Sequence, residues 1–203
     1  MAEVSAIVLE GADGVQTPAE LWDEIQPGHI EAWRQTWLPA RALIVERLRQ
    51  DGLTGADLPQ SRNWDWEKKL EGIRGQLLFP TFAVMSADGV QGLMQLDTLE
   101  SAREPSQAGS ALVQVSFLEV APWNWSTPYQ TPRYRGVGMA LMTAAVQLSV
   151  DQGSKGRLGL HALPQAEGFY REACGMLDLG PDPAFGGLKW FEMTSDVADQ
   201  FLK

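Results

Sequence analysis

The sequence contains one cysteine, Cys174, and two histidines, His29 and His161, among 203 residues. A single cysteine cannot form an internal disulfide, and so few Cys and His residues provide no metal-binding cluster, so we expect no metal site. No run of about eighteen apolar residues occurs, which predicts no membrane span. The first residues lack a basic start followed by an apolar stretch, so we expect a cytoplasmic protein.

Basic residues are also scarce. The 16 Lys and Arg residues stand against 26 Asp and Glu residues, which gives a formal net charge of -10 at pH 7. Because nucleic-acid binding needs a surface rich in Lys and Arg, this balance argues against a nucleic-acid partner. An acidic surface attracts cationic substrates such as amines, but it also keeps a protein soluble, and the sequence leaves both explanations open.

The first third of the chain combines one predicted strand with predicted helices. Val4–Leu9 is an apolar run that favours a strand, and residues 17–20 (Thr-Pro-Ala-Glu) have the N-cap, proline and glutamate pattern of a helix start. Apolar residues from Ile30 to Leu48 recur every three or four positions, which predicts a helix that Pro39 kinks or divides. A short helix is predicted over 64–73.

The rest of the chain changes to a mostly β pattern. Asp88-Gly89 lies between the apolar runs 82–85 and 90–94, which predicts a tight hairpin. Between the later strands, the segment 122–132 contains several Pro and Trp residues and is predicted to be a long loop. Further strands are predicted over 112–120, 158–163 and 188–193. The segment 138–150 is apolar nearly all round, which predicts a buried helix, and a second helix is predicted over 165–176.

The clearest motif is the segment Arg133-Tyr134-Arg135-Gly136-Val137-Gly138-Met139, which precedes the buried helix. Glycine lets a backbone turn tightly and approach a ligand closely. The N–H groups of the loop and of the first helical turn then converge on one point, which suits an anion such as a pyrophosphate, and the two arginines would add charge-assisted bonds. Because glycine turns are common, the segment alone indicates a phosphate site without identifying the ligand.

Two common nucleotide-binding motifs do not fit this segment. The dinucleotide-binding fingerprint needs a third glycine, and Leu141 stands at that position. The phosphate-binding loop of nucleoside triphosphatases needs Gly-Lys-Ser or Gly-Lys-Thr, which does not follow.

Three motifs together resemble the GNAT superfamily of acetyl-CoA-dependent N-acetyltransferases. Arg133, Gly136 and Gly138 match its Gln/Arg-x-x-Gly-x-Gly/Ala signature. The segment 118–122 (Leu-Glu-Val-Ala-Pro) looks like the end of its fourth strand, and the segment 166–176 resembles its Ala-x-x-Phe-Tyr…Gly-Phe helix. These motifs occur in the family's order, and the resemblance extends over about residues 82–193.

The resemblance implies an α/β (α+β) fold with a central mixed, mostly antiparallel sheet flanked by helices. It implies a single domain over 1–203, in which 1–76 supplies a strand and helices on the substrate side and 77–203 supplies the sheet and the acetyl-CoA-binding core. Acetyl-CoA would be the co-substrate, and a primary amine of a small molecule or peptide would be the acceptor. The family resemblance is compatible with a homodimer and leaves the oligomeric state open.

The resemblance also assigns residues to the cofactor. The strand end would splay from its neighbour, so that exposed backbone groups pair with the pantetheine arm, and a backbone N–H near Val120 would bind the oxyanion. The residues expected to bind acetyl-CoA are Leu118, Val120, Arg133, Tyr134, Arg135, Gly136, Val137, Gly138 and Met139.

Glu119 and Tyr170 are the candidates for acid–base chemistry. Glu119 lies on the same strand face as apolar residues, where burial would raise its pKa and make it a base; a carboxylate that points into water is the alternative. The resemblance places Tyr170 beside the CoA sulfur as general acid, and a half-buried tyrosine on an amphipathic helix is the alternative. His161 is a further candidate base, although a core or rim histidine is favoured. We interpret His29 as a solvated residue at a helix start and Cys174 as a small core residue.

The leading hypothesis from the sequence is therefore an N-acetyltransferase. A non-catalytic module with a GNAT-like fold that binds CoA or a protein is the alternative, because a fold alone does not determine a function. A third hypothesis keeps the fold and the cofactor but changes the chemistry, for instance to a longer acyl donor or to decarboxylation of an acyl-CoA.

Overall fold

The computed structural model describes residues 2–125 and 130–203 and divides into two compact units. The first unit comprises residues 1–76, 81–93 and 118–140, and the second comprises 77–80, 94–117 and 141–203. The chain passes from one unit to the other several times, within single strands and within one long helix. The assignment of one domain to 1–203 stays a prediction.

Among the described residues, nine strands pair in the order β6 (Tyr134–Arg135), β1 (Val4–Gly11), β2 (Gln16–Trp22), β3 (Thr81–Ser86), β4 (Gly89–Ser101), β5 (Ala111–Val120), β7 (Leu158–Ala162), β9 (Leu188–Met193) and β8 (Leu177–Asp182). β5 and β7 run parallel. The antiparallel pairs include β1–β2, β1–β6, β2–β3, β7–β9 and β8–β9. The predicted fold class, a mixed and mostly antiparallel sheet with helices, is confirmed.

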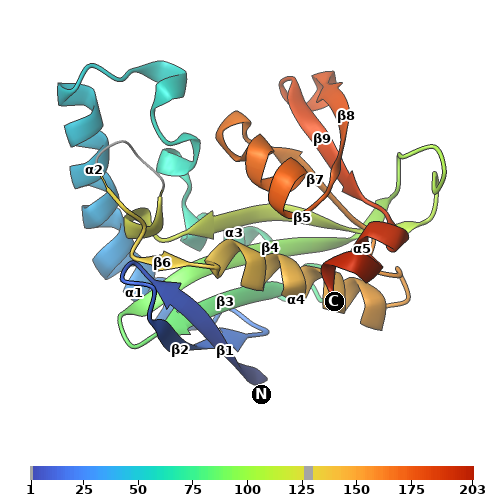
Figure 1. The fold of residues 1–203 in the computed structure, drawn as a ribbon, viewed down its shortest axis with the longest axis horizontal. Coiled ribbons are helices and arrows are strands. Elements are labelled where there is room, and N and C mark those ends of the chain that lie inside the picture. The colour runs from blue at the N-terminus through green and yellow to red at the C-terminus, as the bar shows by residue number, and fades with distance from the viewer. Residues whose placement is uncertain (1, 126–129) are drawn as a thin grey trace. The chain divides into compact units, whose positions relative to one another are not determined.

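The first unit begins with a β-hairpin where the sequence predicts a strand followed by a helix. β1 and β2 lie side by side in antiparallel register, drawn in blue in Figure 1, with Val8 opposite Pro18. The helix start predicted at residues 17–20 is therefore wrong. Gly14 takes a φ of 78° in the turn that connects the two strands. The pairing of β2 with β3 starts at Ala19, so Pro18, which has no N–H to donate, lies outside it. The local capping pattern is overridden by strand pairing.

The predicted helical stretch of the first unit is present. It comprises α1 (Pro27–Ala32), a π-helical segment η1 (Trp33–Trp37) and α2 (Leu38–Gln50). Pro39 is the second residue of α2, and Trp37 and Leu38 both keep right-handed helical dihedral angles, so Pro39 does not divide the helical backbone there. Short 3-10 turns η2 (Gly55–Asp57) and η3 (Gln60–Asn63) lead to α3 (Trp66–Gly72), the predicted short helix. The core of the first unit contains the fully buried side chains of Trp33, Trp37 and Trp66.

The β3–β4 hairpin and the helix that follows the glycine turn also match the sequence. Gly89 has a φ of 98° at the predicted Asp88-Gly89 turn. The helix α4 spans Val137–Asp151. It is not buried nearly all round, because Thr143 and Gln147 are exposed.

The second unit departs from the predicted pattern after β7. The helix predicted over 165–176 is a 3-10 turn η5 (Pro164–Ala166) followed by a π-helical segment η6 (Phe169–Ala173). The strand β8, which follows directly, was not predicted, and it pairs with β9 through a register irregularity. A turn η7 (Pro183–Phe185) and a final helix α5 (Ser195–Phe201) complete the unit, whose buried core includes Leu112, Leu158 and Phe191.

Candidate functional site

The glycine turn in the first unit has the geometry that the sequence predicts. β6 pairs with β1, with Arg135 opposite Glu10, and the next residue, Gly136, takes a φ of 88° that favours glycine. α4 starts at Val137, and the carbonyl of Gly136 accepts a hydrogen bond from the N–H of Ala140 at 2.9 Å. The N–H groups of a first helical turn have no acceptor within the helix, so the turn offers donors at the positive end of a helix of 15 residues.

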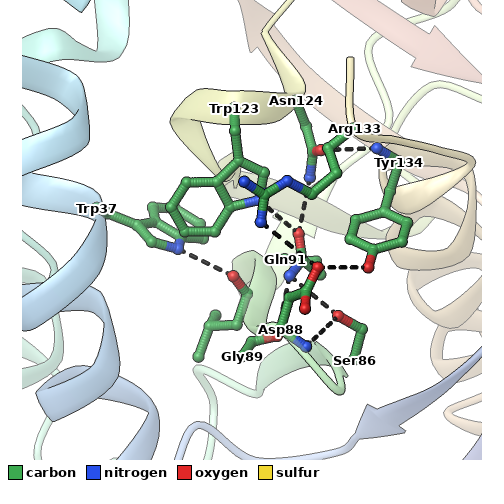
Figure 2. Close-up of polar contacts among 10 residues, drawn as sticks. Trp37, Ser86, Asp88, Gly89, Gln91, Trp123, Asn124, Arg133 and Tyr134 are labelled. Atoms are coloured by element: carbon green, nitrogen blue, oxygen red, sulfur yellow. Dashed lines mark hydrogen bonds and ion pairs between the residues drawn. The ribbon is translucent and has the colours of Figure 1, made fainter. Parts of the chain in front are cut away.

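The side chains of Arg133 and Tyr134 both reach Asp88 in the β3–β4 turn (Figure 2). Arg133 Nη1 lies 3.4 Å from Asp88 Oδ2, and the Tyr134 hydroxyl donates to the same oxygen at 2.7 Å. The Arg133 guanidinium also lies 5.4 Å from the centre of the Trp123 ring. Arg133 therefore has an internal anionic partner. About half of each paired side chain is exposed, so the pair is weak enough for a phosphate to replace Asp88.

The loop between β5 and the glycine turn is closed at its base. It begins with a 3-10 turn, η4 (Pro122–Asn124), and residues 126–129 of the predicted loop lie outside the described part of the chain. The N–H of Arg133 donates to the carbonyl of Trp123 at 3.1 Å, and the N–H of Tyr134 donates to Asn124 Oδ1 at 2.9 Å. These hydrogen bonds therefore hold the residues just after β5, the strand that carries Glu119, beside the residues just before the glycine turn, within the first unit.

Glu119 is buried, with 2% of its surface exposed, as the strand pattern predicts. Its Oε2 accepts a hydrogen bond of 2.7 Å from Trp66 Nε1. Its Oε1 lies 3.7 Å from Nη1 of Arg41, whose guanidinium donates to the carbonyls of Ser61 and Trp64. Oε1 is buried and accepts no hydrogen bond from the part of the chain that the structure describes, and its charged neighbour is the Arg41 guanidinium.

Burial raises the pKa of Glu119 from 4.5 to about 7, although Trp66, Arg41, Ser61 and Lys69 each lower it. The carboxyl group is therefore poised to gain or lose a proton near neutral pH, which is what a general base requires. Sequence reasoning did not find Trp66 and Arg41 as its partners, because neither residue belongs to a motif.

Lys69 is a second titratable group in this cluster. Its Nζ lies 4.6 Å from the centre of the Trp64 ring, and burial lowers its pKa to about 8 against the opposing effects of Glu119 and Asp65. Both Lys69 and Glu119 thus change charge close to neutral pH.

In the second unit, β5 and β7 pair in parallel register, which joins Val113 to Leu158 and Gln114 to Gly159. β5 itself continues as a strand to Val120. The splayed strand end that the family resemblance implies stays a prediction. Leu118 and Val120, the predicted cofactor-binding residues at the end of β5, are half-buried and belong to the first unit.

Tyr170 lies on η6 in the second unit. It is buried, with 7% of its surface exposed, and its ring lies 5.3 Å from the ring of Phe169 and 6.3 Å from that of Phe191. Burial raises the pKa of its hydroxyl, so the group stays protonated at neutral pH, as a general acid must. Tyr170 is therefore buried and not half-buried as the alternative expects, and its role as general acid stays a prediction.

His161 and Cys174 behave as structural residues. His161 Nε2 lies 2.9 Å from Asp182 Oδ2, and its ring stacks on Phe185 at 3.7 Å, which agrees with the favoured core or rim histidine. The hydrogen bond from His161 and the contact with Arg103 lower the pKa of Asp182 to about 2. Cys174 is buried, and burial raises its pKa to about 12, so its thiol is protonated at neutral pH.

The interpretation of His29 as a solvated residue is wrong. His29 is 5% exposed, and its ring packs edge-on against Trp22 with centroids 5.0 Å apart. Its Nδ1 accepts the N–H of Gln26 at 3.0 Å, so the histidine caps α1, and burial lowers its pKa.

Two general properties of the described residues bear on the kind of site. They contain no group of three or more His, Cys, Asp and Glu side chains arranged to hold a metal ion. Among the same residues, no helix combines the length and apolar character needed to cross a membrane.

Comparisons with known proteins identify the fold. No protein-family model matches the chain, and no curated protein matches it. A protein from Desulfovibrio desulfuricans assigned to the GNAT family of acetyltransferases is 14% identical, with a TM-score of 0.53 over 87% of this chain and 99% of that one. The PaiA N-acetyltransferase from Thermoplasma acidophilum, solved in complex with coenzyme A, is 12% identical, with a TM-score of 0.54 over 87% and 98%.

A third solved structure, FeeM, an N-acyl amino acid synthase from uncultured soil microbes, is 11% identical, with a TM-score of 0.52 over 98% of this chain and 94% of that one. The chain therefore has the fold of the GNAT acetyltransferases, as the three sequence motifs predict. At these identities the likeness concerns the fold alone.

Proposed function

We propose that this protein transfers an acetyl group from acetyl-CoA to a primary amine of a small molecule or peptide. The observation that carries the proposal is the Glu119 carboxyl group. It is buried at the end of β5, has a pKa of about 7 and keeps Oε1 without a hydrogen bond from the described residues. The hydrogen-bonded base of the 123–134 loop ties this strand end to a glycine turn suited to phosphate.

In this proposal the glycine turn binds the pyrophosphate of acetyl-CoA. The N–H groups of Val137, Gly138 and Met139 donate to phosphate oxygens at the positive end of α4. Arg133 exchanges its pair with Asp88 for a phosphate, and Arg135, which is exposed beside Gly136, adds a second positive charge. Backbone groups of Leu118 and Val120 hold the pantetheine arm. The coenzyme A bound to PaiA and the shared fold support this placement.

The chemistry needs one base and one acid. An alkylamine is mostly protonated at neutral pH, so a proton must leave before its nitrogen can attack the thioester carbonyl. Glu119 accepts this proton at Oε1, directly or through water. The C–N bond forms, the C–S bond breaks, and Tyr170 donates its proton to the departing thiolate to give free CoA. The nitrogen then loses its second proton to solvent, Tyr170 regains one from solvent, and Glu119 releases the proton it accepted, so that one proton in total leaves with the products. At neutral pH a Glu119 carboxyl with a pKa of about 7 is partly ionised and can accept a proton, and Tyr170, whose pKa is raised by burial, is protonated.

The proposal is tested by incubating the protein with acetyl-CoA and a panel of primary amines that includes polyamines, amino acids, aminoglycosides and short peptides. We expect release of the CoA thiol that depends on one class of amine, with an acetylated product in the mass spectrum. Binding of acetyl-CoA with no transfer to any amine would instead favour the non-catalytic module.

A further inference from the structure

The buried amide of Gln91 is the centre of a partly buried hydrogen-bond network in the first unit (Figure 2). Gln91 is 0% exposed. Its Nε2 donates to Ser86 Oγ and to the carbonyl of Gly89, both at 3.1 Å. Its Oε1 accepts from Trp123 Nε1 at 2.8 Å and from Asn124 Nδ2 at 3.0 Å. Two donors and two acceptors are all that a glutamine amide offers, so the side chain is fully used.

Asn124 extends this network to the glycine turn. The side chain donates through Nδ2 to Gln91 and accepts through Oδ1 the N–H of Tyr134, the first residue of β6. The backbone on either side is also held, because the N–H of Ala121 donates to the carbonyl of Gln91 at 2.8 Å and the N–H of Asn124 donates to the carbonyl of Ala121 at 2.8 Å. Gln91 and Asn124 thus join β4, the end of β5 and the strand before the turn.

We propose that Gln91 and Asn124 are positioning residues that hold the glycine turn in its cofactor-binding geometry. Neither side chain needs to touch the cofactor. Asn124 fixes the backbone two residues before Gly136, and Gln91 fixes Asn124. Without these bonds the loop base opens, and the N–H groups of the turn no longer converge on one point. The inference rests on the proposed function, because it assigns a role at the same cofactor site.

The test compares Asn124→Leu with a matched control, Thr81→Val, by calorimetric titration with acetyl-CoA. Each variant removes a side-chain oxygen that accepts a backbone N–H at 2.9 Å. Asn124 Oδ1 accepts the N–H of Tyr134, and Thr81 Oγ1 accepts the N–H of Ile25. We expect the Kd for acetyl-CoA to rise by at least about tenfold in Asn124→Leu and by less than about twofold in Thr81→Val, although both variants lose stability. In steady-state assays KM for acetyl-CoA should rise in Asn124→Leu while kcat stays within about threefold.

The second variant is Gln91→Met, which leaves the Asn124–Tyr134 bond in place. We expect its Kd for acetyl-CoA to rise by more than that of Thr81→Val and by less than that of Asn124→Leu. Denaturant midpoints measured alongside show whether each variant is folded. Equal Kd values for the parent and for the folded Asn124→Leu or Gln91→Met variant would overturn the inference. So would an equal loss of affinity in Thr81→Val, because the effect would then follow stability rather than position. A folded parent that does not bind acetyl-CoA would instead contradict the proposed function.

Discussion

Replacing Glu119 by Gln is expected to lower kcat for acetyl transfer by a factor of roughly 10²–10⁴, the usual contribution of a general base. The glutamine side chain would retain an acceptor for Trp66 Nε1, so the loss would come from the proton acceptor and not from the buried hydrogen bond. The measurement is the steady-state rate at saturating acetyl-CoA and amine, with KM determined for both substrates.

A matched control is available in the second unit. Glu192 is also fully buried and accepts a hydrogen bond from a tryptophan, Trp190 Nε1, at 2.9 Å. It additionally accepts the N–H groups of Arg103 and Glu104, which gives it a structural role. In Glu192→Gln, kcat should change by less than about threefold where the variant remains folded. A similar kcat for Glu119→Gln and the parent would exclude Glu119 as the base.

The raised pKa of Glu119 adds a pH signature to this prediction. A base works when ionised, so kcat/KM should rise with pH through about 7, and this rise should be absent in Glu119→Gln. Stability has the opposite dependence. The folded protein retains this proton up to about pH 7, whereas the unfolded chain releases it near 4.5, so the contribution of Glu119 to stability is greatest below 4.5 and decreases as pH rises to 7.

Replacing Tyr170 by Phe is expected to lower kcat by a comparable factor of roughly 10²–10⁴, because the departing thiolate would lose its proton donor. Phe fills the same volume against Phe169 and Phe191, so the denaturant midpoint and the Kd for acetyl-CoA should change little. These two quantities separate a loss of the acid from a loss of packing.

Burial raises the pKa of Tyr170, so the parent should show no loss of kcat from deprotonation of this tyrosine at or below its ordinary pKa of 10. A reduction of kcat by less than about threefold in Tyr170→Phe would make the acid role untenable.

The sequence predicted the elements whose signals are local. Asp88-Gly89 specified a hairpin because a tight turn needs positive φ. The alternation along β5 placed Glu119 on the apolar face as one of two alternatives, and the burial of Glu119 decides between them. Gly136 was expected to turn the backbone before α4, and it does. In each case the physical cause lies within a few residues of the feature.

Other features depend on residues that are distant in the sequence. Trp66 donates to Glu119 from 53 positions away, and Asn124 donates to Gln91 from 33 positions away, and no spacing rule connects such pairs. The helix predicted at residues 17–20 failed for the same reason, because pairing with β1 and β3 outweighs a capping pattern. The partner of Arg133, Asp88, could not be inferred either, since it requires the hairpin to lie beside the glycine turn.

Whether the glycine turn binds acetyl-CoA is best measured by calorimetric titration of the parent and of Gly138→Trp. Gly138 lies in the first turn of α4, where an indole would cover the N–H groups proposed to bind phosphate. We expect a Kd in the micromolar range, a binding free energy of roughly -8 kcal/mol, for the parent and no measurable binding by a Gly138→Trp variant with an unchanged denaturant midpoint. The absence of binding by the folded parent, or equal binding by the two proteins, would contradict this expectation.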